Sequence, residues 1–323
     1  MPLQPTPRIR TGQADWPLPR EEFEKRFRAA FFDPANEARA TFVDALLQVA
    51  WDAYCNSRKS PRVRRAGEGY FDPDYELSVE WIAAHEAVCA AQRQQQDGSA
   101  PSRYLLICAS PRNDKTCPGE MSKSFRLMNA AREVLARQEA QVDVLDLSAL
   151  TSEYGRQIFP CKACISTAMP LCHWPCSCYP NHSLGQVRDW MNEIYPRWVA
   201  AHGILIVTPV HWYQAPTTLK SMMDRLVCAD GGNPDPTTTH GKDPAAAKAL
   251  ELRGWHYPRH LAGRCFAVVV HGDAAGAGIL RRSLTDWLQD MGLIEESVRK
   301  TTQGVRANDH PPGTRARLQS TCG

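Results

Sequence analysis

From Arg103 onward, the apolar residues of this chain switch repeatedly between strand spacing and helix spacing. Short apolar runs typical of strands occupy residues 105–109, 142–147, 203–208, 265–270 and 293–298. Stripes at helical spacing lie between them, such as Leu127, Met128, Ala131, Val134 and Leu135. This alternation is typical of a parallel sheet with both faces covered by helices. We therefore expect an α/β fold with a doubly wound, five-stranded parallel sheet.

The rest of the chain has a different pattern. Residues 1–20 are Pro-rich and polar, helical spacing recurs over 21–32, 36–54 and 75–92, and residues 93–100 form a polar linker. Residues 229–262 are rich in Gly, Pro, Asp and His and predict a long loop insertion. We expect an N-terminal arm and helical extension over 1–100, the sheet domain over 101–300 and a polar tail over 301–323.

Composition excludes several function classes. The chain has 323 residues and a net charge of +3, which gives no reason to expect a nucleic-acid or membrane-surface partner. No apolar run approaches the ~20 residues of a membrane helix. The first residues lack the layout of a signal peptide, so a cytoplasmic location is expected.

The first apolar run of the sheet domain ends in a polar turn. Ser110 offers a hydroxyl and Arg112 a guanidinium, and an amphipathic helix begins near residues 120–122. A helix N-terminus after such a turn favours a phosphate, because its N–H groups and dipole attract anions. The turn is neither a Walker A motif nor G-x-G-x-x-G. Ser122 is equally explained as a helix cap, and Arg112 as a solvated loop charge.

Two other strand ends carry polar or small residues, in segments 208–216 and 271–276. Ligands of open parallel sheets bind beyond the carboxyl ends of the strands, at the point where strand order reverses. We expect the third strand to neighbour the first, so that the loops after both strands border one crevice.

These segments resemble a known family. Ser110-Pro111-Arg112 with Ser122 and Ser124, and Thr208-Pro209-Val210-His211-Trp212 with Leu219-Lys220 and Asp224-Arg225, resemble the flavodoxin-like NAD(P)H-dependent FMN reductases, which are related to iron–sulfur flavoproteins. The resemblance covers roughly residues 103–298 and implies a flavodoxin-like sheet. The chain differs from the family at Ala109, where a Gly is usual, and in the insertion at residues 116–119.

The resemblance implies an FMN-dependent oxidoreductase that passes electrons from the co-substrate NAD(P)H to a quinone, a flavin or another small-molecule acceptor. It also implies a homo-oligomer. The flavin carries the redox chemistry, so no catalytic side chain is expected. The implied cofactor-binding residues are Ser110, Arg112, Ser122, Ser124, Thr208, Pro209, Val210, His211, Trp212, Tyr213, Gly272 and Asp273.

Simpler explanations exist for several of these residues. Trp212 and Tyr213 could wall the flavin ring, or could pack in the core or against another subunit. His211 could be a plain surface histidine. Asp224 and Arg225 are expected to form a salt-bridged pair on their helix rather than a catalytic pair. Gly272 and Gly276 would allow close backbone approach to the ring.

Two other function classes remain open. One is an iron–sulfur flavoprotein or flavodoxin-type electron carrier that does not use a nicotinamide directly. The other is a regulatory or assembly protein without turnover. The slight positive charge and the helical extension disfavour a simple flavodoxin. The sequence names neither the acceptor nor the preferred nicotinamide.

Five of the twelve cysteines lie within eighteen positions: Cys161, Cys164, Cys172, Cys176 and Cys178. Three interpretations compete, which are a metal or iron–sulfur site, a thiol redox pair, and reduced thiols that pack in a rigid loop. The spacing does not begin C-x-x-C-x-x-C, as ferredoxin-type clusters do. We expect packed thiols without a bound metal, with these five residues as the candidate ligands otherwise.

Overall fold

In the computed structural model, residues 18–34, 39–116, 119–272 and 275–296 are described. The polar tail expected over 301–323 and most of the expected arm lie outside these ranges. The helices are α1 (Arg20–Ala30), α2 (Ala40–Cys55), α3 (Val79–Gln96), α4 (Lys123–Ala136), α5 (Ala149–Ser152), α6 (Met191–Ala200), α7 (Thr217–Arg225), α8 (Pro244–Leu252) and α9 (Ala277–Asp290). The strands are β1 (Val63–Arg65), β2 (Glu76–Ser78), β3 (Arg103–Cys108), β4 (Gln141–Asp146), β5 (Gly203–Pro209), β6 (Cys265–His271) and β7 (Ile294–Glu295).

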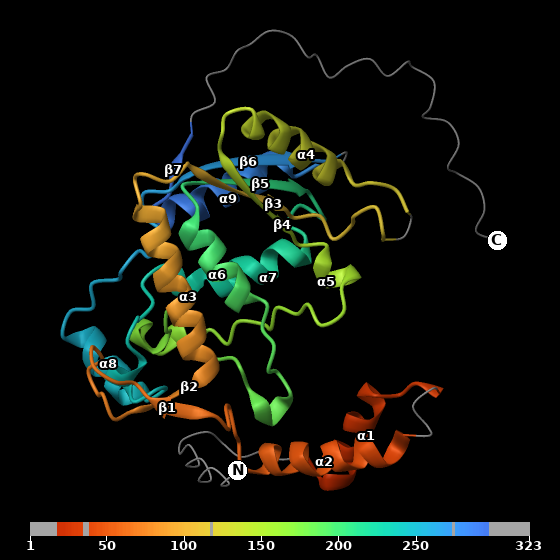
Figure 1. The fold of residues 1–323 in the computed structure, drawn as a ribbon, viewed down its shortest axis with the longest axis vertical. Coiled ribbons are helices and arrows are strands. Elements are labelled where there is room, and N and C mark those ends of the chain that lie inside the picture. The colour runs from red at the N-terminus through yellow and green to blue at the C-terminus, as the bar shows by residue number, and fades with distance from the viewer. Residues whose placement is uncertain (1–17, 35–38, 117–118, 273–274, 297–323) are drawn as a thin grey trace.

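The main sheet has five parallel strands in the order β4-β3-β5-β6-β7 (Figure 1). Leu106 of β3 lies opposite Val144 of β4 and Leu205 of β5, which fixes the register at the centre. The order reverses at β3, as a flavodoxin-like doubly wound sheet requires. The expected fold class is confirmed, and so is the expected pairing of the third strand with the first.

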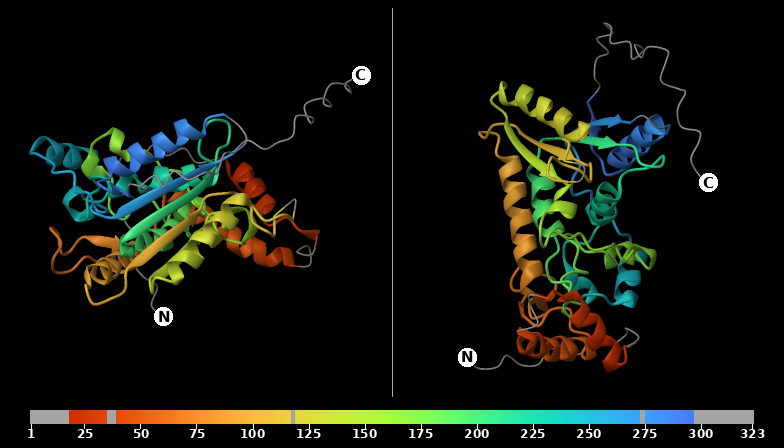
Figure 2. Two further views of the ribbon diagram at one scale, coloured as in Figure 1. Left: turned by 90° about the horizontal axis from the view of Figure 1, so that it is seen from above. Right: turned by 90° about the vertical axis from the view of Figure 1, so that its right-hand side faces the viewer.

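Strand β3 is buried on both faces, in agreement with its apolar run. Leu105 and Ile107 belong to a large core shared with α6, whereas Leu106 and Cys108 pack with Met128 of α4. Figures 1 and 2 show α4 on one side of the sheet and α3, α6 and α7 on the other. The two cores hold the sheet between helical layers.

Coverage of the α4 side is incomplete within the described residues. Helix α4 lies over β3, β4 and β5, and Val269 of β6 keeps 39% of its surface exposed. On the same side, a hollow of about 600 Å³ between α4 and β6 is lined in part by Leu106, Val134, Leu205 and Ala267. The expectation that helices cover both faces therefore holds fully on the α6 side only.

Two segments contain regular structure that the sequence did not predict. Strand β2 stands where the start of a helix was expected, and it pairs antiparallel with β1. Helix α3 accordingly begins only at Val79, capped by Ser78, whose Oγ accepts a hydrogen bond from Trp81 N at 3.1 Å. The insertion contains α8, which the sequence signals: Asp243 is a favoured cap and Pro244 a favoured first helical residue.

Helix α3 packs along α6 and joins the main core through Val88 and Ala91. Its Trp81 Nε1 donates to the carbonyl oxygen of Pro175 at 2.8 Å. Helices α1 and α2 lie together at one end of the molecule (Figure 2). The domain boundary near residue 100 stays a prediction, but α3 is packed against the sheet domain. Within the described residues, no helix is long and apolar enough to cross a bilayer.

Candidate functional site

The loops after β3, β5 and β6 share one edge of the sheet, because these strands are parallel neighbours. We call the segment 109–122 the phosphate loop and the segment 208–214 the ring loop, after their expected roles. Backbone hydrogen bonds join the ends of these strands: Ala109 N donates to Val207 O and Val210 N donates to His271 O, each at 2.9 Å. The structure therefore brings together most of the residues that the sequence singled out.

In the phosphate loop, Ser110 is buried and its Oγ accepts a hydrogen bond from Arg112 N at 3.1 Å. Arg112 Nη2 donates to the carbonyl oxygen of Glu120 at 3.3 Å and lies 3.8 Å from the Glu120 carboxylate. The guanidinium thus joins the residues after β3 to the residues just before α4. Burial raises the pKa of the Cys108 thiol, at the end of β3, to about 12, so this thiol stays protonated.

The two serines at the start of α4 have different partners. Ser122 is the helix cap, and its Oγ accepts from Phe125 N at 3.1 Å. The cap explanation left open by the sequence therefore describes Ser122. Ser124 is fully buried, and its Oγ lies 2.7 Å from Nε2 of His271 at the end of β6.

Sequence reasoning missed Asn113, which fixes the phosphate loop against α5. Its Nδ2 donates to Ser148 Oγ at 2.7 Å and Ser152 Oγ at 3.1 Å, and its Oδ1 accepts from Lys115 N at 2.8 Å. The last bond is an Asx turn, for which Asn in a polar turn is the usual signal. A cleft of about 550 Å³ on this side is lined by Pro111, Arg112, Lys115, Thr116, Thr151 and Ser152.

The ring loop begins buried and ends exposed. Thr208 and Val210 are buried, and Thr208 Oγ1 donates to the carbonyl oxygen of Pro209. His211 and Gln214 then close a tight turn through reciprocal backbone bonds of 2.9 and 2.8 Å. At the tip of this turn, Trp212 is 92% exposed and Tyr213 is 56% exposed. Packing of Trp212 in the core of the protomer is therefore excluded.

Two glycines let the neighbouring segment approach the ring loop. A Cβ on Gly272 would lie 2.5 Å from Val210 Cγ1, and one on Gly276 would lie 2.8 Å from Tyr213 Cα. Gly276 also has φ 108° at the start of α9, where a side chain would be strained. The absence of a side chain at these two glycines thus allows their backbone to contact the ring loop closely. Asp273 lies outside the described residues.

The cysteine-rich loop is folded against the core. Cys172, Cys176 and Cys178 are buried, and Cys161 and Cys164 are partly exposed. Lys242 Nζ lies 3.7 Å from Cys164 Sγ and donates to Leu171 O. The neighbouring Cys172 thiol raises the pKa of Cys164 to about 11, so Cys164 is a thiol at neutral pH.

Among the residues that the structure describes, no group of three or more His, Cys, Asp or Glu side chains is arranged to hold a metal ion. The thiol interpretation of the loop stays a prediction.

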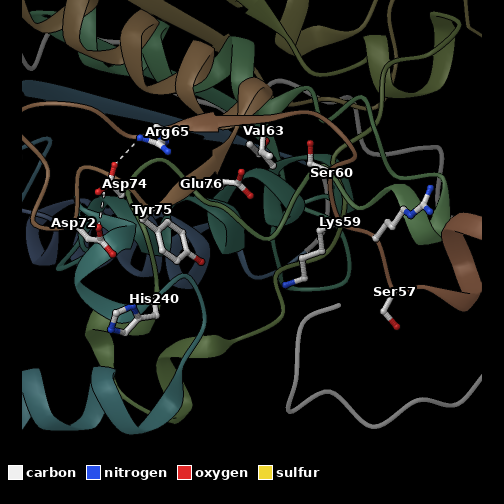
Figure 3. A pocket seen from close by; sticks show the side chains of 12 residues that line it. Ser57, Lys59, Ser60, Val63, Arg65, Asp72, Asp74, Tyr75, Glu76 and His240 are labelled. Atoms are coloured by element: carbon white, nitrogen blue, oxygen red, sulfur yellow. Dashed lines mark hydrogen bonds and ion pairs between the residues drawn. The ribbon is translucent and has the colours of Figure 1, made fainter. Parts of the chain in front are cut away.

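Another pocket, of about 540 Å³, lies beside β1 and β2. Figure 3 shows Lys59, Tyr75 and Glu76 directed toward it. Arg65 Nη1 lies 3.0 Å from Asp74 Oδ1 and forms an ion pair at the rim. Its lining mixes cations and carboxylates and includes no residue of the phosphate loop or the ring loop. We therefore take the loops at the carboxyl ends of β3, β5 and β6, not this pocket, as the candidate site.

Comparison with known proteins gives the following matches. The profile of the family described as NADPH-dependent FMN reductase matches residues 102–298. An iron-sulfur flavoprotein of Methanosarcina thermophila is 29% identical over 121 residues, which are 38% of this chain and 50% of that protein. The chain thus spans about half the length of this relative.

Two solved structures are also similar. RosB with a bound 8-demethyl-8-formylriboflavin-5'-phosphate intermediate has a TM-score of 0.40 and 12% identity, covering 61% of this chain and 62% of RosB. An azoreductase from Bacillus anthracis str. Sterne has a TM-score of 0.33 and 14% identity, covering 60% of this chain and 84% of the azoreductase.

Proposed function

This chain belongs to the NADPH-dependent FMN reductase family, and from that premise we propose that it is an FMN-dependent oxidoreductase. Electrons would enter from NAD(P)H and leave to a quinone, a flavin or another small-molecule acceptor. One observation carries the proposal. The family match, residues 102–298, covers the five-stranded sheet, and the phosphate loop and the ring loop lie together at the carboxyl ends of its strands.

The residues at the phosphate loop fit the phosphate of FMN. Helix α4 has fourteen residues, and its first N–H groups lack acceptors within the helix. Ser124 lies in the first turn of this helix, and the Ser110 hydroxyl and the Arg112 cation lie in the loop that leads into it. A phosphate dianion would be held by charge-assisted hydrogen bonds and by the helix dipole.

The ring loop would hold the isoalloxazine. Its backbone is fixed at Val210 by the hydrogen bond to His271 O and at His211 by the closed turn, so the tip that carries Trp212 and Tyr213 is held in place before a ligand arrives. Trp212 and Tyr213 offer exposed aromatic surface to a flat ring and would exclude water from it. FMN, when bound, supplies the hydride and electron chemistry. The protein's share is binding, orientation and shielding.

We also propose that the protein works in the cytoplasm as a homo-oligomer, without a nucleic-acid or membrane partner. The five cysteines of the cysteine-rich loop form no disulfide among the described residues, which fits a reducing compartment. The partly uncovered side of the sheet at Val269 leaves apolar surface for another subunit.

The test is an absorbance spectrum of the purified protein, followed by anaerobic titration with NADPH and, separately, NADH. We expect a flavin spectrum that NADPH bleaches. A protein that binds FMN but is reduced by dithionite and by neither nicotinamide would instead be an electron carrier. A protein that neither retains nor rebinds FMN would contradict the flavin site itself.

A further inference from the structure

Two polar side chains of the site, Ser124 and His271, are joined by a hydrogen bond between segments far apart in the sequence. Ser124 Oγ and His271 Nε2 are 2.7 Å apart, and 147 positions separate the residues. Their elements, α4 and β6, are not sequence neighbours, and β5 lies between β3 and β6 in the sheet. The bond therefore connects the phosphate loop's helix to the far side of the site.

The position of Ser124 suggests a role beyond capping. The cap of α4 is already Ser122, whose Oγ accepts from Phe125 N. Ser124 is the second residue of the helix and is fully buried, so its hydroxyl is not a solvated surface group. It lies in the first turn, where backbone N–H groups and the helix dipole favour an anion.

His271 is held by the ring loop. It pairs with Pro209 in the sheet register, and its carbonyl oxygen accepts a hydrogen bond from Val210 N at 2.9 Å. The next residue, Gly272, lies against Val210 so closely that a Cβ would come within 2.5 Å of the valine side chain. The backbone that carries the His271 imidazole is thus fixed relative to the ring loop.

We propose that His271 is a positioning residue for the phosphate of FMN: its Nε2–H donates to Ser124 Oγ and leaves the serine proton for a phosphate oxygen. A hydroxyl has one proton to donate and two lone pairs to accept with. If Ser124 donated to the imidazole, it would present only lone pairs to a dianion. Bound phosphate therefore selects the histidine form that carries a proton on Nε2. This inference rests on the proposed FMN function.

The arrangement predicts an effect that depends on the phosphate group. Riboflavin has the ring of FMN but no phosphate, so the ratio of the riboflavin Kd to the FMN Kd isolates the phosphate contribution. Apoprotein would be titrated with each ligand, following quenching of flavin fluorescence. The variants are Ser124→Ala, His271→Ala, His271→Gln and the double alanine variant, and His211→Ala is the matched histidine control in the ring loop.

We expect Ser124→Ala and His271→Ala each to raise the FMN Kd about tenfold, the effect of losing one charge-assisted hydrogen bond. The riboflavin Kd should stay unchanged. His271→Gln keeps an N–H donor and should retain FMN affinity, and the double variant should be no weaker than either single one, because both remove the same interaction. His211→Ala should leave the Kd ratio as in the unaltered protein.

Three results would overturn the inference. These are an FMN Kd unaffected by His271→Ala, an equal loss of FMN and riboflavin affinity, and a failure of His271→Gln to restore binding in protein with an unchanged circular dichroism spectrum. Failure of the proposed function looks different: the unaltered protein would then bind neither FMN nor riboflavin.

Discussion

Arg225, the last residue of α7, shows how a single buried charge organises the surroundings of the site. Its side chain is 1% exposed, and Nη2 lies 2.5 Å from Asp189 Oδ2, which is equally buried. Nη1 donates to the carbonyl oxygen of Phe159 at 2.8 Å, and the guanidinium lies over the Tyr179 ring. Arg225 therefore joins the helix after the ring loop to the cysteine-rich segment.

The expected pairing of Arg225 with Asp224 is wrong. Asp224 pairs instead with Lys220 on the exposed side of α7. Adjacent residues on a helix point about 100° apart, so Asp224 and Arg225 cannot share a face. Sequence spacing alone could have excluded the expected pair. It could not have identified Asp189, which lies 36 positions away.

We predict that Arg225→Met lowers the free energy of unfolding by about 3–5 kcal/mol, because Asp189 would remain buried without a countercharge. Urea unfolding followed by circular dichroism measures the change. The control is Asp224→Asn, which breaks an exposed pair and should change stability by about 1 kcal/mol or less. Equal losses in both variants would contradict a special role for the buried pair.

Among the elements, the turn at the tip of the ring loop is the one whose sequence fits its backbone least. Trp212 has φ 47° and Tyr213 φ 67°, positive values at both central positions, as in a type I′ turn. Asn-Gly is the favoured sequence there, and bulky residues at positive φ are uncommon. Unfavourable backbone geometry in two exposed aromatic residues is typical of functional sites.

We predict that the double replacement Trp212→Asn, Tyr213→Gly stabilises the apoprotein by roughly 1 kcal/mol, since it relieves this strain. The same replacement should weaken FMN binding, because the aromatic surface is lost. Thermal unfolding and FMN titration measure the two effects. Tyr257, at φ 46° outside the ring loop, provides the control: Tyr257→Asn should leave FMN affinity unchanged. Undiminished FMN affinity in the double variant would remove the aromatic pair from the site.

Element positions were more predictable than side-chain partners, for physical reasons. A strand buried on both faces needs an uninterrupted apolar run, so the run at 105–109 located β3 (Arg103–Cys108) closely. The turn at Trp212 and Tyr213 was not predictable, because neither residue is a turn signal. The bond from Ser124 to His271 depends on strand order and register together, and no local pattern in the sequence encodes it.

At the scale of the whole molecule, the residues before the sheet domain differ in how they are attached. Helix α3 buries Trp81, Ile82 and Val88, and Val88 belongs to the core shared with α6. Helix α1 buries no side chain, and α2 buries only Leu47 and Ala53 among its described residues. The N-terminal extension predicted as one unit therefore contains a helix of the core and a peripheral helix pair.

This difference predicts opposite outcomes for two truncations. Removal of residues 1–56 deletes α1 and α2 but keeps the segment whose Lys59 O accepts from His182 N, so residues 57–323 should fold and bind FMN. Removal of residues 1–100 also deletes α3 and uncovers α6. The sheet domain then loses Val88 and Ala91 from its core and the Trp81 Nε1 donor to Pro175 O. Each large buried apolar side chain contributes about 1.5–3 kcal/mol, so this loss is a substantial part of the ~5–15 kcal/mol stability of an ordinary domain. We expect residues 101–323 to show no cooperative thermal transition by circular dichroism. A transition as sharp as that of residues 57–323 would show that the sheet domain stands without α3 and that its boundary lies near residue 100.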